Sequence, residues 1–451
     1  MNKKDILGRI EDFNAQQLFD FINQGAVTLQ ELKDTGNLDS SLRKAVGALQ
    51  TKVEREDDNA WEQARYGNEM VLSDYITRFP AGRHVDEAKT RIDNLEAQRN
   101  TIKAQKQNIL YNIKRNPNSY PPNEIKEFLN NGIFIEQDLL NCDIPQSAIN
   151  NLDKIKTPNL VLGDTPDSIP DGYTEVYFWG GTGSGKTCAL GAILQMAEQK
   201  GYLNIATGPG YLYANQLKNM FSDDGNANDY LPAPSPLDKT QYLPFTLKKP
   251  NEKVSRSISL IELSGEIFKC FFYKNASQPY PSKDHEDTFN SLNTFLKSDN
   301  RKIHFFFVDY DRENRPDKDG LKQSDYLAAA STYFKNNAVF GKTTDVIYIV
   351  LTKSDLLLDK QGNHVPLNER VEYAKQHLNE NNYKAFINTL KDNCKKNSIN
   401  AGKLTVEPFS LGKVYFKQIC DFDGSAAENI VEILMDRIAG SKKSILDIFN
   451  K

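Results

Sequence analysis

The sequence predicts an α/β protein with a three-layer, mostly parallel sheet, preceded by an all-helical N-terminal domain that contains an internal duplication. Residues 172–451 alternate short apolar, β-prone runs with helix-prone runs, which is the pattern of a parallel sheet covered on both faces. Residues 1–156 show helical spacing instead, and two of their segments resemble each other. The polar run 157–171 holds three prolines and predicts a linker between the two domains.

Composition narrows the class of protein. A chain of 451 residues is long enough for two or three domains, and its net charge of −4 argues against general nucleic-acid binding. No N-terminal run has the length of a signal peptide, and no stretch approaches 18 apolar residues, so we expect a cytoplasmic protein with no membrane contact. The five cysteines form no C-x-x-C pair, which predicts neither a disulfide framework nor a zinc site.

The helical domain is expected to be built from two similar units. Residues 18–25 resemble residues 125–132 at an offset of 107, and the similarity continues through Val27, Leu29 and Leu32 against Phe134, Glu136 and Leu139. Each copy predicts a short helix, a glycine turn and further short helices. Between the copies, helices are expected over 61–78 and 84–115, packed as a hairpin. The domain is either an arm that binds a protein effector or activator, or a structural cap; oligomerisation through it stays open.

The stretch 174–190 carries the strongest motif. Its residues 180–187, GGTGSGKT, match G-x-x-x-x-G-K-[ST], with an apolar strand before them and a helix after them. Glycines let successive backbone N–H groups face phosphate oxygens, the lysine reaches the β- and γ-phosphates, and the threonine hydroxyl ligates Mg²⁺. This predicts a P-loop nucleotide-binding domain. The expected phosphate-contacting residues are Gly181, Thr182, Gly183, Ser184, Gly185, Lys186, Thr187 and Cys188.

The elements after this loop follow in order. Strands are expected at 203–207, 242–248, 257–263, 303–309, 346–351 and 404–409. Helices are expected at 211–221, 321–334, 371–377, 383–394 and 426–438, with a loop over 222–236 and two long insertions over 271–300 and 310–320.

Three of these strands run into polar segments, and ligands of open α/β sheets bind at the carboxyl ends of strands. These segments are Glu262-Leu-Ser-Gly265-Glu266, Thr352-Lys353-Ser-Asp355 and Ser410-Leu411-Gly412. In this order after the loop, they resemble the third, fourth and fifth motifs of Ras-like, translation-factor-related P-loop GTPases, over about residues 172–440. An aspartate in the fourth motif can accept two hydrogen bonds from the guanine N1–H and N2–H₂, which adenine does not offer.

The resemblance implies GTP or GDP as ligand, with Mg²⁺. It implies that Lys353 and Asp355, with Thr352, Ser410 and Leu411, read guanine, and that Gly265 senses the γ-phosphate. The metal would be held by Thr187 and by a threonine that lies between the loop and Glu262 in the sequence. Glu262 would contact the ligands of the metal rather than the metal itself. Thr240 and Thr246 are the candidates for that threonine, and Thr240 is favoured. The catalytic residues would be Lys186, Glu266 and Thr240.

Two departures bear on hydrolysis. Glu262 replaces the usual aspartate of the third motif, and Glu266 stands where Ras-like proteins have a water-orienting glutamine. We therefore expect GTP hydrolysis to be slow or to depend on a partner. In the charged loop 310–320, Arg312 or Arg315 could swing toward the γ-phosphate as an arginine finger.

The set of motifs is most similar to bacterial double-GTPases and related conflict-system GTPases, a resemblance that implies a role in bacterial defence. The chain is thus expected to be a GTP-dependent switch with a helical partner-binding arm. Two alternatives stay open: a P-loop ATPase with a degenerate fourth motif, and a nucleotide-bound scaffold that does not hydrolyse.

Overall fold

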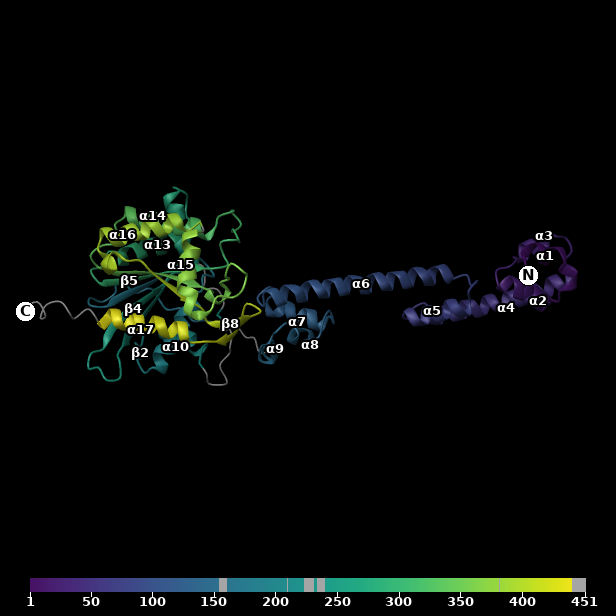
Figure 1. The fold of residues 1–451 in the computed structure, drawn as a ribbon, viewed down its shortest axis with the longest axis horizontal. Helices are drawn as coiled ribbons and strands as arrows, with labels where there is room; N and C mark the ends of the chain where they lie inside the picture. The colour runs from purple at the N-terminus through teal and green to yellow at the C-terminus, as the bar shows by residue number, and fades with distance from the viewer. Residues whose placement is uncertain (154–159, 209, 223–230, 233–239, 381, 440–451) are drawn as a thin grey trace, which may run out of the picture. The chain divides into compact units, whose positions relative to one another are not determined.

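The computed structural model describes residues 1–153, 160–208, 210–222, 231–232, 240–380 and 382–439. The chain forms two compact units. The first comprises residues 1–111 with 131–134, and the second comprises 112–130 with 135–451. The predicted linker 157–171 is described only from residue 160, and the predicted loop 222–236 lies largely outside the described residues. Figure 1 shows the elements along the chain.

The first unit is helical. It holds α1 (Lys3–Gly8), α2 (Ala15–Asn23), α3 (Leu29–Asp34), α4 (Ser40–Ala64), α5 (Glu69–Arg78) and most of α6 (Val85–Arg115). The prediction of one helix over 61–78 is wrong. The side chain of Asn68 accepts a 3.1 Å hydrogen bond from the backbone N–H of Val71, so a new helix starts there and α4 ends at Ala64.

The two segments with similar sequences have matching local structures. Helix α7 (Pro122–Asn130) has the bounds of α2 shifted by 107 residues, and α8 (Glu136–Leu140) starts 107 residues after α3. The glycine after each first helix has a positive φ, 71° at Gly25 and 67° at Gly132, where a residue with a Cβ would be strained. The buried positions correspond as well, since Leu18 and Ile125 are both fully buried.

The correspondence extends beyond the predicted stretch. The backbone N–H of Thr28 donates to the Glu31 carboxylate at 3.0 Å, and that of Ile135 donates to the Asp138 carboxylate at 2.9 Å, which is the same cap at an offset of 107. Helix α1 corresponds to the last turns of α6, and α9 (Gln146–Asn151) corresponds to the start of α4. Each copy therefore spans four helical segments.

The second unit is a mixed α/β fold around a seven-stranded, mostly parallel sheet, as predicted. Its order is β2-β3-β4-β1-β5-β6-β7, and β3 alone runs antiparallel to its neighbours. The strands are β1 (Thr174–Trp179), β2 (Leu203–Ile205), β3 (Gln241–Leu247), β4 (Arg256–Glu262), β5 (Arg301–Asp309), β6 (Thr344–Thr352) and β7 (Thr405–Phe409).

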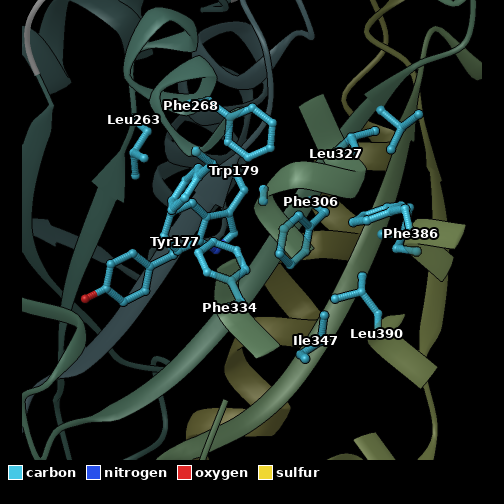
Figure 2. Packing of buried hydrophobic residues seen from close by; sticks show 14 of the residues in the cluster. Tyr177, Trp179, Leu263, Phe268, Phe306, Leu327, Phe334, Ile347, Phe386 and Leu390 are labelled. Atoms are coloured by element: carbon cyan, nitrogen blue, oxygen red, sulfur yellow. The ribbon is translucent and has the colours of Figure 1, made fainter. Parts of the chain in front are cut away.

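Helices cover both faces of this sheet. Strand β1 is buried on both sides and alternates, with Val176 and Phe178 in one hydrophobic cluster and Tyr177 and Trp179 in the other. Figure 2 shows Trp179 packed among side chains of the second cluster. The first face carries α10 (Lys186–Gln199), α11 (Tyr211–Asn219) and α17 (Ser425–Ala439). The second carries α12 (Gly265–Asn275), α13 (Lys283–Leu296), α14 (Gln323–Asn336), α15 (Arg370–Glu380) and α16 (Lys384–Lys396).

Two parts of this unit differ from expectation. The stretch expected as an insertion over 271–300 contains the end of α12 and all of α13, whose Phe289 and Leu292 are buried in the core. Aromatic residues at helical spacing explain this burial, and the polar residues between them hid the pattern. A second, two-stranded sheet was not predicted: β8 (Gly412–Tyr415) pairs with β9 (Ile419–Phe422).

The tip of this hairpin joins three parts of the chain. At the tip, the backbone N–H of Phe416 donates to the Pro117 carbonyl at 2.9 Å, and that of Lys417 donates to the Asn118 side chain at 2.7 Å. The carbonyl oxygen of Gln418 accepts a 2.7 Å hydrogen bond from the Leu231 N–H.

Among the described residues, no helix is long and apolar enough to cross a membrane.

Candidate functional site

The glycine loop (residues 180–187) joins β1 to α10. Gly183 and Gly185 have φ values of 76° and 87°, in the left-handed region that favours glycine. A Cβ added to Gly180 would lie 2.7 Å from the carbonyl oxygen of Phe307, so the loop also needs glycine to approach β5. The loop folds around the Lys186 side chain, whose Nζ donates to the carbonyl oxygens of Gly180 at 2.7 Å and Gly181 at 3.0 Å.

The ammonium of Lys186 is buried at the centre of this loop. Burial lowers the pKa of Lys186 to about 8, against the opposing effect of the Glu262 and Glu266 carboxylates, and the positive charge of Arg312 lowers it further. A buried cation with only partial neutralisation attracts an anion, which would stabilise its charged form.

The first turn of α10 faces the end of β4. The hydroxyl of Thr187 donates to one carboxylate oxygen of Glu262, and the hydroxyl of Tyr213 on α11 donates to the other at 2.8 Å. Glu262 is only 2% exposed. Cys188 follows in the same turn, where burial raises the pKa of its thiol, so it is not a reactive thiolate.

Thr240 lies beside this pair. The antiparallel pairing of β3 and β4 sets Gln241 opposite Glu262, so Thr240 falls just beyond the end of β4, whereas Thr246 pairs with Ser257 near the other end of β3. Thr240 is 2% exposed, and within the described residues its hydroxyl has no hydrogen-bond partner.

The residues at this end of β4 fit a small, hard cation. Two threonine hydroxyls and a carboxylate are the oxygen donors that Mg²⁺ takes, and the orphaned hydroxyl of Thr240 is a buried polar group that such an ion would satisfy. The described residues hold no group of three His, Cys, Asp or Glu side chains that could bind a metal by themselves. The site therefore suits an ion whose remaining ligands are supplied by water molecules and phosphate oxygens.

The start of α12 lies against the glycine loop. A Cβ on Gly265 would overlap the backbone of Thr182, so only glycine allows this approach. The hydroxyl of Thr182 donates to Glu266 Oε1 at 2.9 Å, and Lys269 Nζ lies 3.1 Å from the same oxygen. Glu266 is thus held toward the loop, with its charge balanced by Lys269.

The end of β6 also contacts the loop. The hydroxyl of Thr352 lies 3.0 Å from the carbonyl oxygen of Ser184 and 3.2 Å from that of Val308, and donates to these acceptors. Lys353 follows with a φ of 56°, and its Nζ lies 2.7 Å from Asp309 Oδ2. The segment after β6 is therefore tied to the loop and to the end of β5.

Asp355 lies in a 3-10 helix (Ser354–Leu356) that follows Lys353 and packs against β7. Burial raises the pKa of its carboxyl, against the opposing effects of a backbone hydrogen bond and of Arg370. The register pairs Thr352 with Phe409, so Ser410 and Leu411 leave the sheet beside the 3-10 helix. Ser410 accepts a 3.4 Å hydrogen bond from Arg370 Nη1.

The predicted residues fall into two groups at this edge of the sheet. One group lies around Lys186 and comprises the loop, Thr240, Glu262, Gly265, Glu266 and Thr352. The other group lies at the ends of β6 and β7 and comprises Asp355, Ser410 and Leu411. Sequence reasoning missed Tyr213, which holds Glu262, and Asp309, which holds Lys353. Asp309 closes an apolar strand, so the strand-end argument applied to the other strands would have found it.

No family model matches the chain, and no curated protein matches it. One solved structure to which it is similar is that of the S. cerevisiae Ski7 GTPase-like domain, bound to GTP, at 16% sequence identity and a TM-score of 0.30. The match covers 61% of this chain and 52% of that one, so the chain spans about half of its length. The superposition is too loose to transfer the properties of that domain.

Proposed function

We propose that this chain binds GTP with Mg²⁺ at the glycine loop, hydrolyses it slowly or on contact with a protein partner, and acts as a nucleotide-dependent switch. The observation that carries the proposal is a set of three hydrogen bonds between the loop and the strand ends around it. Thr187 contacts Glu262, Thr182 contacts Glu266, and Thr352 contacts Ser184. These contacts join the loop to the two strand ends that carry the third and fourth GTPase-like motifs.

In this proposal the loop holds the phosphates. The backbone N–H groups of 181–188 and the ammonium of Lys186 bind phosphate oxygens, and the N-terminus of α10 adds its positive dipole end. Thr187 and Thr240 would hold Mg²⁺, and Glu262 would orient the Thr187 hydroxyl toward the ion. The ion, when bound, neutralises charge on the β- and γ-phosphates.

Guanine would be read at the ends of β6 and β7. The Asp355 carboxylate accepts hydrogen bonds from the base, the stem of Lys353 lies over it, and Thr352, Ser410 and Leu411 line the site. The pairing of Lys353 with Asp309 supports this role, because it fixes the lysine beside the loop. A partly buried Asp355 also gains from a ligand that supplies two donors.

Hydrolysis would be governed by the start of α12. Gly265 touches the loop backbone, so a γ-phosphate contact there moves α12, and Glu266 moves with it. Glu266 would orient the attacking water once its contact with Thr182 is released. The helical module would present this change to a protein effector or activator.

A second candidate function is a nucleotide-bound scaffold that does not hydrolyse. Its supporting observation is that Thr182 donates to Glu266 Oε1 and Lys269 Nζ lies beside the same oxygen, so these contacts already engage that oxygen and hold the side chain. The narrower resemblance to bacterial conflict-system GTPases, with its implied defence role, rests on the sequence motifs.

Calorimetric titration of the full chain with GTP, GDP and a non-hydrolysable ATP analogue in Mg²⁺ tests the proposal. We expect guanine-nucleotide binding without ATP binding, lost in Lys186→Ala and kept in Lys200→Ala at the other end of α10. ATP binding would instead favour the ATPase alternative, and no binding at all would refute nucleotide recognition. Phosphate release over many turnovers then separates the enzyme from the scaffold.

A further inference from the structure

Arg312 lies in a segment that is fixed on its N-terminal side. Gln323 of α14 accepts a 2.8 Å hydrogen bond from the Asp309 N–H and donates one of 2.9 Å to the Asp309 carbonyl. The Asp309 carboxylate in turn accepts from the Asp311 N–H at 3.0 Å. The backbone of the turn that leads from β5 to Arg312 is therefore held by two groups, the side chain of Gln323 and the carboxylate of Asp309.

The segment is also fixed on its C-terminal side. The Glu313 side chain is buried and accepts hydrogen bonds from the Ser324 N–H at 3.0 Å, the Ser324 hydroxyl at 2.6 Å and the Asn382 side chain at 3.0 Å. The backbone of a residue held between two anchored neighbours loses little further conformational freedom when its side chain binds a ligand. The charged loop 310–320 is therefore anchored to α14 at Glu313.

The guanidinium of Arg312 lies against the glycine loop. A Cβ built on Gly183 would be 3.4 Å from Arg312 Nη1, an ordinary van der Waals distance. Its positive charge is also close enough to lower the pKa of Lys186, in addition to the larger effect of burial. Among the described residues, no carboxylate forms an ion pair with Arg312.

Arg315, three residues later, has a different environment. It forms an ion pair with Asp311, and its side chain is 62% exposed. Its charge is therefore already paired and it lies in solvent, so the structure separates two arginines that the sequence alone left equivalent.

We propose that Arg312 is a catalytic residue supplied by the chain itself, whose guanidinium contacts the phosphates of a nucleotide in the glycine loop and stabilises the charge that develops during hydrolysis. This inference rests on the proposed function. In the reaction, the water oxygen forms a bond to the γ-phosphorus while the bond to the β–γ bridging oxygen breaks. That electron pair stays on GDP, one proton of the water stays on the oxygen that joins the phosphorus, and the other passes to a phosphate oxygen. Arg312 makes no covalent bond; it offers N–H donors to the oxygens that gain charge.

The placement of Arg312 has a mechanistic consequence. An arginine that a partner supplies accelerates hydrolysis only in the complex with that partner. An arginine that already lies against the loop contributes to the rate of hydrolysis by the chain alone. A partner would then stimulate hydrolysis by acting on α12 and Glu266 rather than by supplying an arginine.

The test compares Arg312→Ala, Arg312→Lys and the matched control Arg315→Ala in the full chain. GTP affinity is measured by calorimetry, and hydrolysis is measured by phosphate release in a single turnover. We expect Arg312→Ala to slow hydrolysis by about a thousandfold while the GTP dissociation constant changes by only a few fold. Arg312→Lys should retain part of the rate, and Arg315→Ala should match the unmodified chain.

A second readout does not depend on turnover. Aluminium fluoride with GDP mimics a γ-phosphoryl group in transit, so the unmodified chain should bind it without a partner, and Arg312→Ala should not. Equal losses of GTP affinity and rate in Arg312→Ala would make the residue a ground-state phosphate ligand and overturn the catalytic role. So would an unchanged rate, or a chain that binds GTP without hydrolysing it. A chain that binds no GTP would instead refute the proposed function itself.

Discussion

The hydroxyl of Thr352, at the end of β6, donates to the carbonyl oxygen of Ser184 in the glycine loop at 3.0 Å. The two residues are 168 positions apart in the chain. The loop that would bind phosphates and the segment that would read the base are thereby joined by one buried contact, in addition to their common sheet.

Thr352→Val should weaken this link. The change keeps the shape of the side chain but leaves the buried carbonyl oxygen of Ser184 without this donor, which costs about 1–3 kcal/mol of the free energy of unfolding. Because the loop is loosened, affinity for GTP and GDP should fall together, by calorimetry. Thr344→Val is the matched control at the other end of β6. Its hydroxyl is buried without a partner among the described residues, so its loss should leave stability unchanged or raise it.

Asp355→Asn should change base preference from guanine toward xanthine. An amide can donate to the xanthine oxygen that replaces the guanine amino group, while it loses the charge-assisted acceptance of guanine N–H donors. We expect GTP affinity to fall by about 10- to 100-fold and xanthosine triphosphate affinity to rise. Asp359→Asn is the control, because Asp359 is partly exposed and its carboxylate caps its own turn. Equal effects on both nucleotides would contradict the role of Asp355 as base reader.

Glu262→Gln should raise the Mg²⁺ requirement. The carboxylate accepts from Thr187 and Tyr213, and a group that orients a metal ligand typically contributes 10- to 100-fold to metal affinity. Nucleotide binding measured at increasing Mg²⁺ should shift its midpoint by about that factor, while binding at saturating Mg²⁺ is kept. Tyr213→Phe, which leaves the carboxylate in place, should shift the midpoint less. A midpoint that does not move would exclude Glu262 from the metal site.

His304 should make the protein less stable in acid. Burial lowers the pKa of His304 to about 3, and its Nδ1 accepts a 3.0 Å hydrogen bond from Trp179 Nε1, so the folded chain holds it neutral. In the unfolded chain its pKa is about 6.5, so below that pH the unfolded state binds the proton and is favoured. Between pH 6.5 and 4.5 this costs about 2.5 kcal/mol of the free energy of unfolding.

His304→Gln keeps an acceptor for Trp179 and removes the titrating group. Urea unfolding at the two pH values should show a smaller acid loss for His304→Gln than for the unmodified chain. His285→Gln on α13 should leave that loss unchanged. An identical loss in all three proteins would mean that another buried group governs acid stability.

Much of the sheet could be predicted from sequence because its strands are continuous apolar runs with strong breaks between them. The strand ends of β4 and β6 followed from the same rule. The structure brings Glu262 to Thr187 of the loop, and it brings Thr352, which the motif assigns to the base, to Ser184 of the loop. Tyr213 could not be assigned because its hydroxyl acts through one long-range partner, Glu262, which only the packing of α11 determines. Asp309 lies at the end of β5 and follows from the strand-end rule, although its pairing with Lys353 depends on the register of β5 and β6. Helix α13 and the β8–β9 hairpin were missed since their apolar positions are few and interrupted by polar residues.

The β8–β9 hairpin gives the second unit a mechanical linkage. Its base begins at Gly412, next to the end of β7, where the Leu411 carbonyl accepts a 2.7 Å hydrogen bond from the Asp423 N–H. Its tip is bonded to Pro117 and Asn118 in the second helical copy and to Leu231 in the stretch before β3. The hairpin therefore connects that helical copy, through two paired strands, to Leu411 beside the proposed base site.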